Sequence, residues 1–144
     1  GLAINETGRA ALVRIRELQA AGRPVRYDGP VGDDALAAAY AACTFTVYPS
    51  LSEGFGLPVF ESLAQGKPCV CSSRGAIGES ARGGGCRTVD DLDAGGIAAA
   101  IDELLVAPSR VAALAAAAGQ RRFKDWTSYA SELATWARGL ARRH

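Results

Sequence analysis

The stretch that decides the fold is "SLSEGFGLPVFESLAQGKPCV", residues 50–70. A glycine-rich loop leads into a helical pattern with Pro58 in its first turn and Gly66 at its end, where each residue is favoured. Apolar segments typical of strands flank it, "TFTVYPS" at residues 44–50 and "PCVCSS" at residues 68–73. A strand that leads through a loop and a helix into another apolar strand is the repeating unit of a parallel sheet.

The remaining elements alternate in the same way. Strands are expected over residues 24–29 and 86–89, and residues 75–85 form a glycine-rich connection. Helices are expected over residues 8–21, from Asp33 or Asp34 to about Ala42, and over residues 94–106, 109–122 and 126–140, the last with Asp125 as its cap. We therefore predict an α/β fold, a Rossmann-like parallel sheet flanked by helices. It is expected to form a single domain over residues 1–144 that closes with a C-terminal helix at residues 125–144.

Composition excludes several functional classes. The 144 residues are 49% apolar and carry a formal net charge of +1, which is typical of a globular chain without general attraction to nucleic acid. From Arg110 onward the sequence contains seven basic residues and only two acidic ones. We interpret this excess as a solvated helix face rather than a binding patch. The only histidine is His144, so mechanisms that need an internal histidine cannot run on this chain alone.

The cysteines show no metal-site spacing. Cys69 and Cys71 lie two residues apart on an expected strand and therefore share a face. We interpret them, with Cys43 and Cys86, as small buried residues rather than zinc ligands or disulfides. This use of cysteine indicates a cytoplasmic protein. Peripheral contact with the inner face of the membrane is an open alternative.

The glycine-rich loop suits a phosphate. Ligands of open parallel sheets bind beyond the carboxyl ends of the strands, where residues 50–56 lie. Gly54 and Gly56 let backbone amides approach a ligand, and the helix start adds unpaired N–H groups and positive charge. Glu53 and Glu61 could then bind a sugar and a ribose, so the best-fitting ligand is a sugar linked through phosphate to a nucleoside. From glycine spacing alone, ordinary turn glycines and solvated glutamates remain an equal alternative.

A longer segment, "YPSLSEGFGLPVFESLAQGKPCVCSS", resembles the most characteristic segment of the retaining GT-B glycosyltransferases, which include sucrose synthases and bacterial α-mannosyltransferases. The family's Glu-x7-Glu motif falls on Glu53 and Glu61. Its Pro-Ser lead-in and its small-residue exit fall on Pro49, Ser50, Ala64, Gly66 and Pro68. Weaker similarity covers "VRYDGPVGDDALAAAYAAC" and "FKDWTSYA", and with them nearly the whole chain.

The resemblance implies a fold and an activity. The chain would be most of the C-terminal, donor-nucleotide domain of a GT-B enzyme, without that domain's first strands. The enzyme would transfer a sugar from a nucleotide diphosphate sugar to an acceptor hydroxyl with retention, and neither a metal nor another cofactor is expected. The alternative is a non-catalytic binding or interaction module that retains the fold.

The same resemblance assigns the site residues. Glu53 would contact the donor sugar and act as the catalytic residue, and Glu61 would bind the ribose hydroxyls. The backbone amides that would hold the sugar and the diphosphate are those of Gly54, Phe55, Gly56 and Leu57.

The sequence departs from the family at several points. Gly78 precedes Glu79 where the family usually has proline, which leaves the rigidity of this loop open, and Glu79 is interpreted as structural. Asp91 and Asp93 resemble a metal-binding Asp-x-Asp pair, but an aspartate before an amphipathic helix is an ordinary N-cap. The basic residues Lys67, Arg74 and Arg82 do not match the family's phosphate-binding positions.

The resemblance also implies absent parts. The acceptor domain would lie outside this chain, as would two strands that separate residues 24–29 from residues 44–50, so the chain alone should not transfer sugar. One edge of strand 44–50 would then be unpaired, and unpaired edges pair with other chains. We expect self-association at this edge. The open alternatives are pairing with residues 24–29 and a missing segment supplied as a separate chain.

Overall fold

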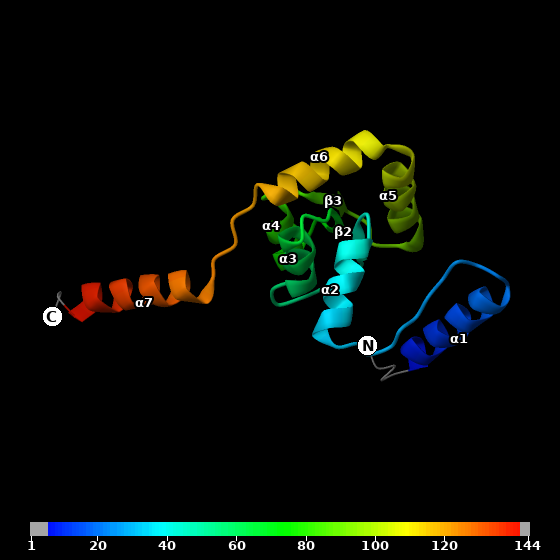
Figure 1. Ribbon diagram of the computed structural model, residues 1–144, viewed down its shortest axis with the longest axis horizontal. Coiled ribbons are helices and arrows are strands. Elements are labelled where there is room, and N and C mark those ends of the chain that lie inside the picture. Colours follow the sequence, from blue (N-terminus) through cyan, green and yellow to red (C-terminus); the bar gives the residue numbers. More distant parts are fainter. Residues whose placement is uncertain (1–5, 142–144) are drawn as a thin grey trace. The chain divides into compact units, whose positions relative to one another are not determined.

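The computed structural model describes residues 6–141 (Figure 1). Contacts between Cα atoms divide the chain into two compact units, Gly1–Ala42 and Cys43–His144. His144 lies outside the described residues.

The first unit contains two helices, α1 (Glu6–Ala20) and α2 (Asp33–Ala42), both close to their predicted bounds. The strand predicted at residues 24–29 is wrong, because these residues are irregular. They use local contacts instead. Gln19 donates from Nε2 to the carbonyl oxygen of Val25 at 3.1 Å, and Arg26 pairs with Asp28 at 2.9 Å. A strand needs another strand beside it, and within residues 6–141 the sheet consists of β1, β2 and β3 without this segment.

The second unit is built on a parallel sheet in the order β1-β2-β3. The strands are β1 (Thr46–Tyr48), β2 (Cys69–Ser72) and β3 (Cys86–Val89), each inside or equal to a predicted range. Thr46 pairs with Cys69, which in turn pairs with Cys86. The predicted parallel α/β sheet is confirmed. Among residues 6–141, β1 has a strand partner on its β2 side alone.

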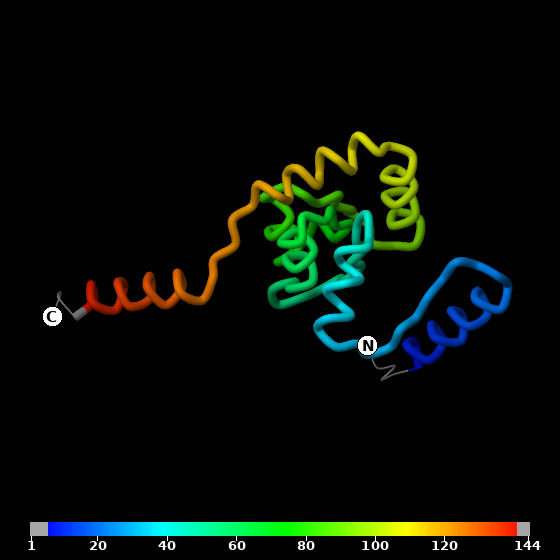
Figure 2. Tube along the Cα trace, viewed as in Figure 1, coloured from blue at the N-terminus to red at the C-terminus, as the bar shows by residue number. Residues whose placement is uncertain are grey.

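Helices cover both faces of this sheet, which can be followed along the chain in Figure 2. On one face, α3 (Leu57–Ala64) and α4 (Gly75–Ala81) bury Val59, Leu63 and Ile77 against Cys69 and Cys71. On the other face, α5 (Ala94–Val106) buries Ala100 and Leu104 against Val70 and Val89. The sixth helix, α6 (Pro108–Gly119), contributes to both clusters. All four residues of β2 are buried, as expected for a central parallel strand.

The bounds of α3 follow from its flanking residues. Pro58 lies in the first turn, as predicted. At the other end the amide of Gly66 donates to Leu63 O and that of Lys67 to Ser62 O, both at 2.9 Å. These two bonds form a Schellman motif, in which Gly66 takes the left-handed conformation, with a φ of +67°, at little cost. The chain therefore turns directly from α3 into β2.

Helix α4 was not predicted, since its segment carries several glycines. The structure gives the reason for one of them. A Cβ on Gly78 would lie 1.9 Å from the carbonyl oxygen of Ser73, so only glycine fits between the helix and the end of β2. The segment that contains Gly78 is therefore a helix. Close packing against Ser73 explains why glycine, and not the family's usual proline, precedes Glu79.

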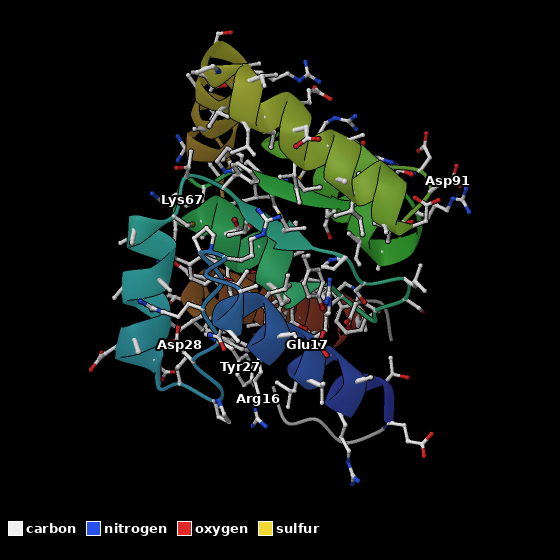
Figure 3. The ribbon with its side chains drawn as sticks, turned by 90° about the vertical axis from the view of Figure 1, so that its right-hand side faces the viewer. Arg16, Glu17, Tyr27, Asp28, Lys67 and Asp91 are labelled. Carbon is white, nitrogen blue, oxygen red and sulfur yellow. The ribbon has the colours of Figure 1, made fainter. Side chains whose placement is uncertain are left out.

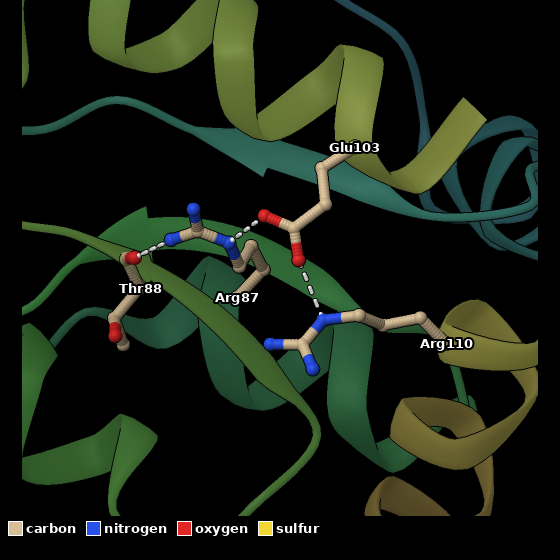
Figure 4. Close-up of polar contacts among 4 residues, drawn as sticks. All are labelled: Arg87, Thr88, Glu103 and Arg110. Carbon is tan, nitrogen blue, oxygen red and sulfur yellow. Dashed lines mark hydrogen bonds and ion pairs between the residues drawn. The ribbon is translucent and has the colours of Figure 1, made fainter. Parts of the chain in front are cut away.

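An ion-pair cluster ties β3 to the helices on its face (Figure 4). Glu103 of α5 accepts from Arg87 of β3 at 2.7 Å and from Arg110 of α6 at 2.6 Å. The bond from Arg87, followed by the charges of both arginines, holds the pKa of Glu103 below its ordinary value. The cluster fixes how α5 and α6 meet the sheet.

The last helix, α7 (Trp126–Ala141), begins as predicted. Asp125 caps it by accepting from the amide of Ser128 at 2.7 Å, and this bond lowers the pKa of the Asp125 carboxyl. Its apolar stripe is exposed, with Trp126 at 86% and Trp136 at 64%. No helix within residues 6–141 is long and apolar enough to cross a membrane.

The cysteines follow the expectation in part. Cys69 and Cys71 are buried, whereas Cys43 and Cys86 are only partly buried, because they lie at the ends of elements rather than in a central strand. No disulfide joins cysteines in the described part of the chain.

Candidate functional site

The candidate site is the connection from β1 to α3, at the carboxyl end of the sheet. β1 ends at Tyr48 and α3 begins at Leu57, so the glycine loop spans residues 49–56. This is where ligands of open parallel sheets bind. The order strand, loop and helix predicted around Glu53 is confirmed.

Glu53 is held in place by two hydroxyl groups. Tyr48 Oη donates to Glu53 Oε1 at 2.5 Å, and Ser50 Oγ donates to the same oxygen at 3.0 Å. The bond from Tyr48, followed by that from Ser50, lowers the pKa of Glu53, and the same contact raises the pKa of Tyr48. Glu53 Oε2 makes no hydrogen bond to the described residues, so an oriented and ionised carboxylate has one oxygen left to accept from a ligand hydroxyl.

The two loop glycines have different roles. Gly56 takes a φ of +76°, and a Cβ there would come within 3.2 Å of Ile77 in α4, so both its conformation and its packing favour glycine. A Cβ on Gly54 would meet no heavy atom within 4 Å. Glycine at 54 therefore leaves open space beside Glu53, while Gly56 brings the loop against α4.

The start of α3 is open to an anion. Gly56 is its N-cap, and no side chain accepts from the first amides. Pro58 supplies no N–H, and the amide of Val59 donates to Gly56 O at 3.0 Å, so the amides at hand are those of Leu57 and the loop. Phe55 and Leu57 are both exposed, at 60% and 59%. Gly54 is exposed as well, whereas Gly56 is buried. A helix N-terminus without a side-chain cap, next to an exposed loop, favours a phosphate.

Glu61 lies in the second turn of α3 and is exposed. Its neighbour Phe60 stacks on Phe55, with ring centroids 4.9 Å apart and planes 17° from parallel. The loop and the first turns of α3 thus bring together all the predicted site residues, Glu53, Gly54, Phe55, Gly56, Leu57 and Glu61, on one continuous segment.

Two of the three basic residues set aside from the sequence, Lys67 and Arg74, have structural contacts. Lys67 donates from Nζ to Cys43 O at 2.9 Å, and Arg74 pairs with Asp91 at 3.4 Å. Asp91 projects at the loop before α5 (Figure 3). Asp93 caps α5 by accepting from the amide of Gly96 at 2.7 Å, which confirms the N-cap interpretation. Across residues 6–141 no cluster of three or more potential metal ligands is found.

Two hollows flank the sheet. One of about 420 Å³ lies beyond the carboxyl ends of the strands, with Leu51, Ser72 and Arg74 in its wall. A larger hollow of about 570 Å³ lies beside β1, with an apolar wall that includes Phe45, Leu104 and Val111. A third hollow, of about 520 Å³, has Phe55, Trp126 and Tyr129 in its wall. The first and third hollows both touch the glycine loop, so size does not identify the site here.

Sequence reasoning missed three partners of the site. Tyr48 and Ser50 orient Glu53, and Arg121 lies over the ring of Phe60, with Cζ 5.6 Å from its centroid. Ser50 was noted only as part of the motif's lead-in. Arg121 follows Phe60 by 61 residues, and no spacing pattern connects the two.

Residues 6–120 match the family described as Glycosyl transferases group 1. The chain belongs to this family. The D-inositol 3-phosphate glycosyltransferase of Thermobispora bispora is 37% identical over 123 residues, which cover 83% of this chain and 29% of that protein. The MMP alpha-(1->4)-mannosyltransferase of Mycolicibacterium hassiacum is 34% identical over 118 residues, covering 78% of this chain and 28% of that protein.

A third relative and a solved structure are also similar to the chain. The O-antigen chain mannosyltransferase B of Escherichia coli is 51% identical over 49 residues, covering 34% of this chain and 13% of that protein. The sucrose-phosphate synthase of Thermosynechococcus elongatus superposes with a TM-score of 0.78 at 26% identity, covering 96% of this chain and 35% of that structure. The Rossmann-like α/β fold is thereby confirmed. The chain spans less than a third of the length of these three curated relatives.

Proposed function

We propose that this chain is the donor-binding part of a retaining glycosyltransferase that moves a sugar from a nucleotide diphosphate sugar to an acceptor hydroxyl. The observation that carries the proposal is the oriented Glu53 carboxylate in a glycine loop that leads into the uncapped start of α3. Membership of the glycosyltransferase family supports the same chemistry.

Each site residue has a distinct role in the proposal. Glu53 accepts from hydroxyls of the donor sugar and serves as the catalytic residue, because its bonds to Tyr48 and Ser50 fix its position and keep it ionised. Amides of residues 54–57 hold the sugar and the diphosphate. Glu61, one turn into α3, accepts from the ribose hydroxyls, which gives charge-assisted bonds.

The same geometry explains how departure of the nucleotide would be favoured. Negative charge grows on the diphosphate as the glycosidic bond breaks. The positive end of α3 and the loop amides stabilise that charge without reorganisation. The proposal assigns no metal or other cofactor to this step. Further phosphate-neutralising cations and the acceptor site come from outside residues 6–141 in this account, so the chain alone should not turn over.

The proposal includes a cytoplasmic location, since buried thiols such as Cys69 and Cys71 suit a reducing compartment. Contact with the inner face of a membrane remains a secondary part of it.

The test is donor affinity measured by calorimetry for three variants. Glu61→Gln should weaken binding of a nucleoside diphosphate sugar about tenfold or more, because charge-assisted bonds contribute about 1.5–3 kcal/mol each. Glu53→Ala should weaken the sugar-linked donor more than the bare nucleoside diphosphate. Asp102→Asn, on the exposed surface of α5, is the matched control and should change neither.

Equal affinities in all three variants would contradict the assigned roles. A non-catalytic binding module that retains the fold is the second candidate. It predicts tight binding of a ligand that does not compete with nucleoside diphosphates.

A further inference from the structure

Arg121, directly after α6, makes contacts that converge on the glycine loop. Its Nη1 donates to Ser80 O at 2.7 Å and to Gly84 O at 3.2 Å, which are carbonyls at the end of α4 and just beyond it. A Cβ on Gly83 would lie 2.7 Å from Arg121 Cζ, so glycine at 83 leaves the room that the guanidinium occupies. Arg121 therefore has a fixed position rather than a solvated one.

From that position the guanidinium contacts two aromatic rings. Its Cζ lies 5.6 Å from the ring centroid of Phe60 and 5.5 Å from that of Phe123. The two rings meet edge to face, with centroids 6.0 Å apart. Cation–π attraction and the edge-to-face pair both favour one orientation of Phe60.

Phe60 in turn contacts the loop itself. Its ring stacks on Phe55, which lies between the two loop glycines. The Phe55 ring remains 60% exposed, so burial alone fixes its orientation only weakly. The stack on Phe60 is therefore a main constraint on residue 55, and through it on the amides at 54 and 56.

Helix α4 braces the same loop from a second direction. A Cβ on Gly56 would lie 3.2 Å from Ile77 Cγ1, so this side of the loop lies beside α4 with no room for a larger residue. Ser80 Oγ lies 3.5 Å from Phe55 O, at the limit of a hydrogen bond, and donates to Ala76 O at 2.8 Å. Because Arg121 holds the carbonyl of Ser80, it fixes α4 as well as Phe60.

We propose that Arg121 is a positioning residue that orders the loop of residues 53–57 through the rings of Phe60 and Phe55 and through α4. It touches neither donor nor acceptor in this account. Its influence on donor binding rests on the proposed function, whereas its influence on loop order does not.

The test compares ¹⁵N relaxation of the ligand-free chain in three proteins. Arg121→Gln should lower the backbone order parameters of residues 53–57 relative to the unaltered chain while leaving those of α5 unchanged. Arg121→Lys, which keeps the charge but loses the forked geometry, should lower them less. Arg122→Ala, an exposed neighbour, is the control and should leave them unchanged.

A second variant separates the ring route from general destabilisation. Phe60→Leu should loosen the same five residues. The double variant Phe60→Leu with Arg121→Gln should loosen them by less than the sum of the two single effects, because the two residues share the ring route. Unchanged loop order in both single variants, or loosening spread evenly over α5 and α6, would overturn the proposal. If Arg121→Gln does not fold, Arg121→Lys and Phe60→Leu decide it.

Binding of a nucleoside diphosphate then tests the functional consequence. Loss of the cation–π contacts and carbonyl bonds predicts about three- to tenfold weaker binding by Arg121→Gln. A looser loop with no nucleotide binding by either protein would refute the proposed function and leave the positioning role standing. Nucleotide binding by both proteins, with the order of residues 53–57 unaltered in Arg121→Gln, would refute the positioning role and leave the proposed function standing.

Discussion

At the scale of single residues, the bond between Tyr48 and Glu53 lowers the pKa of the carboxyl group at the candidate site. Removing the hydroxyl with Tyr48→Phe should raise the pKa of Glu53, since that bond is the main cause of its lowering. Ser50→Ala should raise it less, because its bond is the second cause. Titration of the Glu53 carboxyl carbon by NMR measures both, and a pKa unmoved by Tyr48→Phe would contradict the geometry.

The same bond gives the loop a pH window. A carboxyl with a lowered folded-state pKa stabilises the folded loop above its ordinary pKa, and that contribution disappears as pH falls through the lowered value. A tyrosine with a raised pKa adds stability that is lost as pH rises through the raised value. The ordered loop should therefore persist across the neutral range and loosen at both extremes.

Gly78 gives a residue-scale prediction about stability. Gly78→Ala places a methyl group 1.9 Å from a backbone oxygen, so the free energy of unfolding should fall by about 2 kcal/mol or more. Gly119→Ala, also in a helix but with nothing within 4 Å, should change it by less than about 1 kcal/mol. Urea denaturation measures both, and similar effects of the two changes would show that α4 does not pack as described.

At the scale of elements, the Glu103 cluster should make the helix packing sensitive to acid. The pKa of the Glu103 carboxyl is lowered in the fold. The ion pairs therefore stabilise the fold above the ordinary glutamate pKa, and this stability is lost as pH falls through the lowered value. Glu103→Gln should therefore lower the thermal midpoint at about pH 7 and have little effect in acid. Asp102→Asn, at the exposed neighbouring position, should leave the thermal midpoint unchanged at about pH 7 and in acid. Equal destabilisation by Glu103→Gln at neutral and at acidic pH would contradict this role.

Much of the element pattern was readable from the sequence, because it depends on local signals. Asp93 and Asp125 cap the helices that follow them, and Gly66 ends α3 as its position suggested. Helix α4 was missed because Gly75 and Gly78 lower helix propensity, and the packing that compensates involves Ser73 of the adjoining connection.

The site was predictable as a segment but not as an arrangement. The position of Glu53 beyond a strand follows from local pattern and resemblance. The hydroxyl partners of Glu53 and the contact of Arg121 with Phe60 depend on tertiary geometry between residues that no periodicity relates. The strand predicted at residues 24–29 failed for a related reason, since pairing depends on a neighbour that local pattern cannot supply.

At the scale of the whole molecule, the outer edge of β1 remains a prediction. Thr46 donates toward β2, to Pro68 O at 2.8 Å, so by alternation Val47 directs its backbone groups to the other edge. An apolar hollow of about 570 Å³ lies beside that strand. We propose that copies of the chain associate there, since open strand edges pair readily.

Light scattering over a concentration series checks this association. The chain should form dimers as concentration rises, and Val47→Lys should keep it monomeric because lysine blunts strand edges. A monomer at every concentration, with the amides of Phe45 and Val47 protected from exchange, would contradict the proposal.

The central claim is that residues 53–57 and Glu61 form a site for a nucleotide diphosphate sugar. Its most direct test is an amide-shift titration of the ¹⁵N-labelled chain with several nucleotide sugars and their nucleoside diphosphates. We predict weak, saturable shifts at Glu53, Gly54, Gly56, Leu57 and Glu61, because the loop and the helix start offer amide donors, whereas residues 53–57 and 61 include no basic side chain. Shifts confined to residues far from this loop, or none at millimolar ligand, would contradict the account.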